Sequence, residues 1–395
     1  MGLRRIRPLS GALTLVRSER YSAGLLLGAA ALAVILANTA VGPALEEIRA
    51  TELVVPFTGF GLSVGHWISD GLLAVFFFIV AVELRHELAA GELNGVRRAL
   101  GPALAALGGV VAPAVIFLTL AAGSGLARGW PVPTATDIAF SLGVLAVFGR
   151  GIPNQVRIFL MALAVLDDLV GIVIIAVGFV GELDAMFLLL AALAVAVFGL
   201  LSRLWRPGRH WLIPVMIVCG IAAWCFMANS GVHATIAGVA LGMVMSRAPA
   251  SAAAQRLTPV SNGLCLPLFA FSAALVAVPA VSVGQLSPAF WGILIGLPVG
   301  KFIGITIVGW LLGVAARRRG ERALSMPNVM TVALLGGIGF TVSLLMNQLA
   351  FARMPEVVDE GTIAVLLGSA FSIVVSAIVV SLRARHYRRL LAEHP

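Results

Sequence analysis

The sequence predicts an all-α polytopic membrane protein with about 12 transmembrane helices. Hydrophobic residues make up 60% of its 395 residues, charged residues only 11%, and the mean hydropathy is +1.04. Soluble domains carry charge at about a quarter of their positions, so this composition excludes a soluble fold. The net charge of +9 comes from arginines in short loops between apolar segments, where they act as topology signals. We therefore expect a lipid bilayer around the chain and no nucleic-acid partner.

Apolar runs long enough to cross about 30 Å of hydrocarbon define the expected spans. They lie near residues 21–42, 68–88, 99–122, 133–149, 155–181, 185–202, 211–228, 232–246, 260–280, 289–315, 327–350 and 361–382. If both termini are cytoplasmic, 23 of the 26 arginines fall on the cytoplasmic side, and only Arg49, Arg128 and Arg353 fall outside. Because cytoplasmic loops are enriched in basic residues, this distribution supports that orientation.

The loops between these spans are short, so we expect one membrane domain over residues 1–395. Its cytoplasmic parts are an N-terminal segment at 1–20, expected to stay attached because no cleavage site is evident, and a tail at 383–395. An outer loop at 43–67 contains VVPFTGFGLSV, a β-branched stretch interrupted by proline and glycine. That stretch fits either a small β-hairpin or an irregular loop.

Adjacent carboxylates lie about halfway along the fifth span, in FLMALAVLDDLVGIVIIAVGF, at Asp167 and Asp168. A charge at this depth costs about 3 kcal/mol and calls for a partner or a water-filled cavity. Neighbouring helical residues point about 100° apart, so two roles are more natural than one shared role. A polar knot that locks helices together is the structural alternative. A site for an ion or a proton fits better, because a carboxylate can hold either H+ or a hard cation such as Na+ or Li+.

Two spans contain interruptions at corresponding positions in spans 3–5 and 10–12. The fourth span has WPVPTATDIAF around Asp137, and the eleventh has LLGGIGFTVSLL. Prolines weaken a helix start, and threonines can satisfy the backbone groups that a broken helix exposes. An ordinary helix N-terminus and close-packing glycines are equally good explanations of the two stretches. Paired interruptions of this kind indicate a transporter with inverted repeats and a midplane site.

The only lysine of the chain, Lys301, lies in the tenth span. Lysine can lose its proton when it is desolvated, whereas arginine stays charged. In a chain that otherwise uses arginine throughout, a lysine at this depth indicates an amine that titrates. A fixed ion pair with Asp167 is the alternative.

These motifs resemble the NhaA-type bacterial sodium/proton antiporters along nearly the whole chain. The resemblance is carried by WISDGLLAVFFFIVAVELRHEL, PTATDIAFSLGVLAVFGRGIP, FLMALAVLDDL, ANSGVHATIAGV, LPLFAF, GKFIGI and GGIGFTVSLL, in the order of that family. It implies electrogenic exchange of Na+ or Li+ for two protons by alternating access, in the service of pH and sodium homeostasis. It also implies a secondary transporter without enzymatic activity or cofactor, a bacterial inner-membrane location and a homodimer.

The resemblance also assigns roles to residues. Asp168 is similar to the family's principal cation and proton carrier, with Asp167 beside it as a second Na+/Li+ ligand, and Lys301 is similar to the lysine that pairs with the latter. Asp137 is similar to the acid that balances the half-helix ends where spans 4 and 11 cross, with Thr136 as a polar neighbour.

Three further matches lie outside this central group. Asp70 and Glu83 match acids at the two ends of the second span, the latter near a cytoplasmic funnel. His233 matches a histidine linked to pH dependence, although a lone histidine near a span end is as often structural.

The chain departs from the family pattern mainly where pH is sensed. Those positions hold Ala254, Gln255 and Thr258, and further departures are His86, Ser272 and Phe302. We therefore expect activity to persist with a shifted or broader pH profile.

Three other classes of membrane protein make different demands on the sequence. An intramembrane aspartyl protease needs its aspartates on different helices and typically a GxGD motif, which is absent. A sodium-coupled symporter of related architecture is the main alternative, and it would require a pocket for an organic substrate. A channel would not need carriers that alternate between proton and cation.

Overall fold

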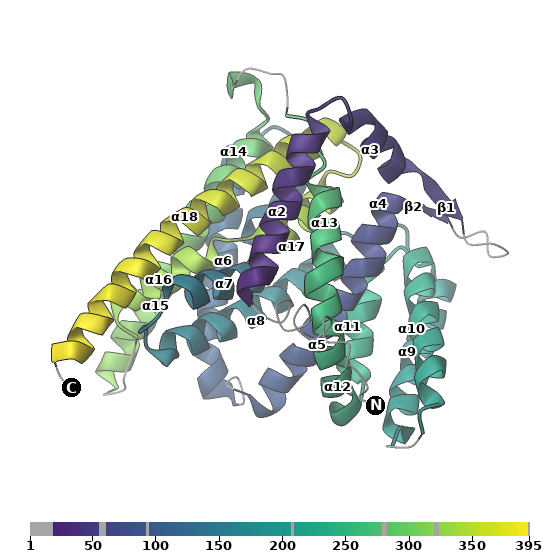
Figure 1. Ribbon diagram of the computed structural model, residues 1–395, viewed down its shortest axis with the longest axis horizontal. Helices are drawn as coiled ribbons and strands as arrows, with labels where there is room; N and C mark the ends of the chain where they lie inside the picture. The colour runs from purple at the N-terminus through teal and green to yellow at the C-terminus, as the bar shows by residue number, and fades with distance from the viewer. Residues whose placement is uncertain are drawn as a thin grey trace, which may run out of the picture.

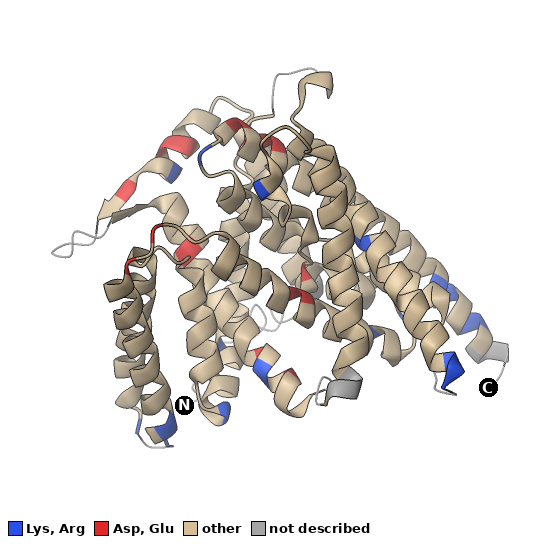
Figure 2. Cartoon of the chain, turned by 180° about the vertical axis from the view of Figure 1, so that it is seen from behind, with Lys and Arg blue, Asp and Glu red and all other residues tan. Residues whose placement is uncertain are grey.

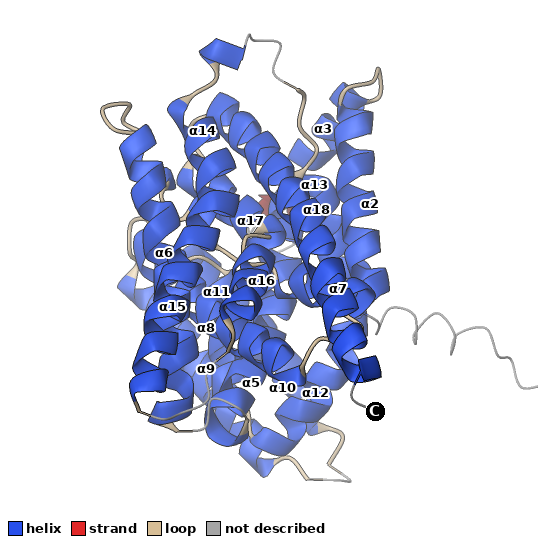
Figure 3. Ribbon diagram, turned by 90° about the vertical axis from the view of Figure 1, so that its left-hand side faces the viewer, coloured by secondary structure: helices blue, strands red, loops and turns tan. Residues whose placement is uncertain are grey.

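The computed structural model describes residues 19–54, 61–91, 95–206, 209–278, 283–319 and 324–393. Within these residues the chain is a bundle of helices with one two-stranded sheet (Figure 3). Most of the predicted N-terminal segment, residues 1–18, lies outside the described part, as do the last two residues of the predicted tail. The all-α membrane fold class is therefore confirmed.

Eight helical segments in the described ranges are long and apolar enough to cross a membrane, or up to ten if each of two bent pairs counts as one span. Six of the helices that build the eight segments are α5 (Leu73–Ala90), α6 (Val96–Leu120), α8 (Asn154–Gly178), α9 (Ala185–Leu204), α10 (Leu212–Asn229) and α18 (Pro355–Glu393). The segment Pro288–Arg318 is built from α14 (Pro288–Ile295), the π-helical turn η6 (Gly296–Gly300) and α15 (Lys301–Arg318). This count is lower than the 12 expected spans.

Two predicted spans differ from the helices observed there. The run at 232–246 holds α11 (Thr235–Val244), which has only 10 residues. The run at 260–280 is the second half of a continuous helix made of α12 (Arg247–Val260), η4 (Ser261–Cys265) and α13 (Leu266–Ala273). Helix α11 thus ends a few residues inside its predicted run, and the second helix begins before its predicted run because the alanine-rich α12 is helical without being apolar.

At one end of the bundle, α2 (Glu19–Ala37) turns by 112° into α3 (Gly42–Ala50), which leads into the sheet (Figure 1). Strands β1 (Glu52–Val54) and β2 (Gly61–Ser63) pair antiparallel. The outer loop therefore contains a hairpin rather than an irregular loop, with its connecting residues 55–60 outside the described part. We call this end of the bundle the hairpin end, and the end where α18 finishes the tail end.

Both predicted interruptions are present in the middle of the bundle. The eleventh span is α16 (Met326–Gly336) and α17 (Phe340–Ala350), bent by 48° at three residues that include Gly337 and Gly339. A Cβ on Gly339 would meet Ser343 and Leu297, so only glycine fits this close approach. The fourth span is the short turn η3 (Val132–Thr134), three extended residues and α7 (Ile138–Phe148). The two breaks face each other in the bundle.

Charge is distributed unevenly along the bundle (Figure 2). Arginines gather at the tail end, most acidic residues of the described part lie at the hairpin end, and a few acidic residues lie inside. A large apolar core surrounds those internal acids and includes Phe117, Phe140, Phe269 and Phe340. An internal charge in such surroundings requires a built polar site.

Candidate functional site

Lys301 forms the centre of the internal polar site. Its side chain is fully buried, and its Nζ donates to Asp167 Oδ2 at 2.7 Å and to Thr136 Oγ1 at 2.9 Å. The glycines on either side of it explain the depth, because a Cβ on Gly300 would meet Pro113 of α6 and a Cβ on Gly304 would meet the α6 backbone. Close packing of α15 on α6 therefore holds the lysine inside the bundle. The ion pair expected between Lys301 and Asp167 is present.

The two adjacent aspartates of α8 have different surroundings. Asp167 Oδ2 is taken by Lys301, while Asp167 Oδ1 is buried and has no hydrogen-bonding partner among the described residues. Asp168 is 7% exposed, and no described residue donates a hydrogen bond to its carboxyl or forms an ion pair with it. The charged groups in electrostatic range of Asp168 include Asp137, Lys301 and Glu83. One carboxylate is thus fixed, and its neighbour is available to a ligand.

Asp137 joins the N-termini of two half-helices. Its Oδ1 accepts from the backbone N–H of Phe140 at 3.2 Å and caps α7, and its Oδ2 accepts from the N–H and the hydroxyl of Thr341 at 3.2 and 2.7 Å. Thr341 is in the first turn of α17. The N-terminus of a helix carries a partial positive charge, so one carboxylate stabilises two helix ends here. This is the position between half-helix ends that the resemblance implied.

The C-terminal end of α16, which carries a partial negative charge, lies near the lysine. Thr136 Oγ1 donates to the carbonyl of Gly336 at 2.9 Å, and Ser141 Oγ donates to the carbonyl of Leu335 at 2.7 Å, both in the last turn of α16. The Asp137 N–H donates to the carbonyl of Ile338 at 2.6 Å. Because these bonds join residues about 200 positions apart, the two interrupted spans cross in a fixed register.

Sequence reasoning missed Ser141 and Thr341. The sequence held only part of the signal for these two residues. Ser141 lies four residues after Asp137, on the same helical face, and Thr341 lies two residues after Gly339 of the break. The sequence of one span does not show which face of α16 or α17 contacts Ser141 and Asp137. Thr136 and Asp137, in contrast, were both predicted and both lie at the crossing.

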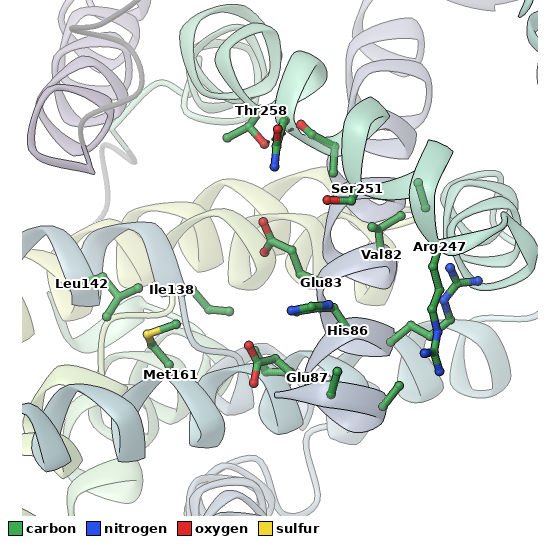
Figure 4. A pocket seen from close by; sticks show the side chains of 17 residues that line it. Val82, Glu83, His86, Glu87, Ile138, Leu142, Met161, Arg247, Ser251 and Thr258 are labelled. Carbon is green, nitrogen blue, oxygen red and sulfur yellow. Dashed lines mark hydrogen bonds between the residues drawn. The ribbon is translucent and has the colours of Figure 1, made fainter. Parts of the chain in front are cut away.

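A cavity of about 520 Å³ reaches toward this site from the tail-end half of the bundle (Figure 4). It lies between α5, α7, α8 and α12, and Figure 4 shows Glu83, His86 and Glu87 of α5 around it. The predicted sensing positions Ala254, Gln255 and Thr258 line its α12 side. Its inner wall includes Ile138, which follows Asp137, and Val165, which lies one turn before Asp168. The cavity thus reaches the sequence neighbours of Asp137 and Asp168, while the carboxylates themselves are not among its lining residues.

Asp70 and His233 form a separate polar cluster nearer the hairpin end. His233 Nε2 lies 3.4 Å from Asp70 Oδ1, and its Nδ1 shares a hydrogen bond with Thr235. The Trp224 indole donates to the backbone carbonyl of Asp70 at 3.0 Å. The structure thus pairs these two predicted residues with each other and does not bring them to Asp168.

Ionisable groups at the crossing of two interrupted helices are typical of secondary transporters, and fold and site put this chain in that class. The model of the family described as Na+/H+ antiporter 1 matches residues 14–380. The chain belongs to this family.

Relatives support the same assignment across the whole chain. The chain is 56% identical over 381 residues to a Na+/H+ antiporter NhaA 2 of Clavibacter michiganensis subsp. michiganensis, covering 95% of this chain and 93% of that protein. It is 47% identical over 373 residues to a Na+/H+ antiporter NhaA of Tropheryma whipplei, covering 93% and 95%. Identity to the NhaA antiporter of Streptomyces avermitilis is 42%, covering 95% and 82%. Members of the family are therefore transporters rather than enzymes.

Proposed function

We propose that this chain exchanges Na+ or Li+ for protons, with Asp168 holding the cation and the proton in turn. The observation that carries the proposal is the contrast within the carboxylate pair: Asp167 is locked to Lys301 at 2.7 Å, while Asp168 beside it has no partner among the described residues. A buried carboxylate without a partner is costly, so it favours binding of either a proton or a cation.

The oxygens around Asp168 suit a hard monovalent cation. Besides the Asp168 carboxylate, Asp167 Oδ1 is buried and has no hydrogen-bonding partner among the described residues, and water entering the tail-end cavity would complete the ligand shell. A bound Na+ and a bound H+ would each neutralise Asp168, so the two compete for it. If the site opens to one side of the membrane at a time, this competition couples outward movement of Na+ to inward movement of protons.

The second proton of an electrogenic cycle would be carried by Lys301. Its burial next to Asp167 supports this role, because an amine shielded from water is easier to deprotonate than a guanidinium. A cation bound between the aspartates would compete with the ammonium for Asp167 and promote its deprotonation. The alternative is an ion pair that stays intact through the cycle.

Substitution Lys301→Arg separates these two roles. We expect a folded variant that has lost electrogenic exchange, because arginine keeps its charge at any accessible pH. Folding is checked by thermal melting in detergent and transport by currents in proteoliposomes. Full electrogenic exchange in this variant would contradict a proton-carrying Lys301 and favour the fixed pair.

The orientation follows from charge. We propose that the arginine-rich tail end faces the cytoplasm and the hairpin end faces outward from a bacterial inner membrane (Figure 2), and that both termini are cytoplasmic. The cavity with Glu83 is then the cytoplasmic entrance, and Asp70 lies toward the outside. The paired interruptions support inverted repeats over spans 3–5 and 10–12 within a 12-span topology, and the hairpin is the proposed contact of a homodimer.

Everted membrane vesicles with a respiration-driven pH gradient test the function. Adding Na+ or Li+ should collapse the gradient, and the response should extend over a broad range within about pH 6 to 9, because the cavity lacks acidic or histidine side chains at Ala254, Gln255 and Thr258. A lack of response across this range would contradict exchange. A sharp activation at alkaline pH would contradict the expected broad pH profile and leave the proposed exchange standing.

A further inference from the structure

A polar cluster far from the aspartates joins the start of α16 to the end of α18. Asn328 Nδ2 donates to the Tyr387 hydroxyl at 2.8 Å, and Asn328 Oδ1 accepts from Arg383 Nη2 at 3.1 Å and from the Tyr387 hydroxyl at 3.2 Å. Arg383 Nη2 also donates to that hydroxyl at 3.2 Å, and its guanidinium lies 5.0 Å from the centre of the Tyr387 ring. We call these three residues the α16–α18 clamp.

The clamp uses the end of a helix that is longer than a membrane crossing requires. Helix α18 has 39 residues, which corresponds to about 58 Å, well over the ~30 Å of a hydrocarbon core. Its last turns run along the start of α16 at the tail end (Figure 1). Asn328 is only 6% exposed, so its amide depends on the two α18 side chains for hydrogen bonds.

The other end of α16 lies at the site. The carbonyl of Gly336 accepts from Thr136, which in turn accepts from Lys301, and Lys301 donates to Asp167. Helix α16 has 11 residues, about 16 Å, with no glycine before its last position. A short, uninterrupted helix moves as one body, so its position at the crossing depends on what holds its start.

We propose that the α16–α18 clamp is a positioning device that sets the cation affinity of the site. By fixing the start of α16, Asn328, Arg383 and Tyr387 hold the Gly336 carbonyl against Thr136 and so hold Lys301 against Asp167. The inference rests on the proposed function, because the readout is exchange of Na+ for protons. Its physical warrant is a continuous series of hydrogen bonds joined by one rigid helix.

Tyr387→Phe tests the clamp with the smallest change, because it removes one hydroxyl and keeps the ring under Arg383. We expect the KM for Na+ in vesicles or proteoliposomes to rise about threefold or more, while the maximal rate stays within about twofold of the parent. Asn328→Leu, which removes all the hydrogen bonds of the amide, should raise KM further. Arg385→Gln is the matched control, since Arg385 is exposed on the same segment of α18 and should leave KM unchanged.

Thermal melting of each variant separates positioning from stability. A lower melting temperature with an unchanged KM would mean that the clamp only stabilises the fold, and would overturn the proposal. The same KM change in Arg385→Gln would also overturn it, since a general effect of charge at the tail end would then be responsible. If the parent protein shows no exchange of Na+ for protons, the proposed function itself fails, and this outcome is distinct from both.

Discussion

Asp168→Asn is expected to abolish Na+/H+ exchange, lowering the rate by at least about 100-fold. Asparagine has nearly the shape of aspartate, but it is neutral and cannot take up a proton, so it can neither attract a cation nor alternate with H+. Because Asp168 has no hydrogen-bonding partner among the described residues, the substitution breaks no internal contact there. The measurement is the collapse of the pH gradient in everted vesicles on addition of Na+ or Li+.

Asp184→Asn is the matched control for this substitution. Asp184 is an exposed acid whose Oδ1 accepts from the backbone N–H groups of Met186 and Phe187 and caps α9. Asparagine caps helices as well as aspartate does, so this variant should transport like the parent. Retained exchange in Asp168→Asn, with Asp184→Asn also active, would remove Asp168 from the transport cycle.

Lys301→Met should destabilise the protein strongly, by about 3–5 kcal/mol. The side chains of Lys301 and Asp167 are 0% and 1% exposed, so removal of the amine leaves a buried carboxylate without a counter-charge. The double variant Asp167→Asn with Lys301→Met also removes the charge of the buried carboxylate. It should therefore recover most of the stability that Lys301→Met loses. Thermal melting of the purified proteins in one detergent measures both effects.

The double variant makes this prediction specific. If Lys301→Met melts like the parent, the ion pair contributes nothing to stability and its structural role is refuted. If Lys301→Met is destabilised and the double variant is equally unstable, lost packing of the lysine stem explains the effect instead. Recovery on removing both charges is the result expected for a buried ion pair.

Much of the site could be predicted from the sequence because the membrane makes internal charge conspicuous. Asp167, Asp168, Asp137 and Lys301 stand out within predominantly apolar spans, and the glycine and proline breaks mark the two interrupted spans. A buried lysine needs an acidic partner, and the resemblance to the antiporter family pointed to Asp167 as that partner. Residue type and depth within each span were sufficient to find the buried charges and the two breaks.

Features set by contacts distant in sequence could not be predicted in the same way. Ser141 and Thr341 form their hydrogen bonds at the crossing only because α7 meets α16 and α17 in one register. Asn328 forms its hydrogen bonds only because the end of α18 reaches the start of α16. The helix that begins at Arg247 was missed for another reason, since hydropathy detects the apolar part of a helix and not its polar extension.

The dependence of Na+ binding on pH tests competition at Asp168 most directly. For the purified protein, the apparent Kd for Na+ should rise about tenfold for each unit by which pH falls below the pKa of the carrier, and Na+ addition to a weakly buffered sample should release protons. Asp168→Asn should lose both responses. A Kd that stays constant across the pH range in which the protein transports, with no proton release, would contradict exchange by competition for a single carboxylate.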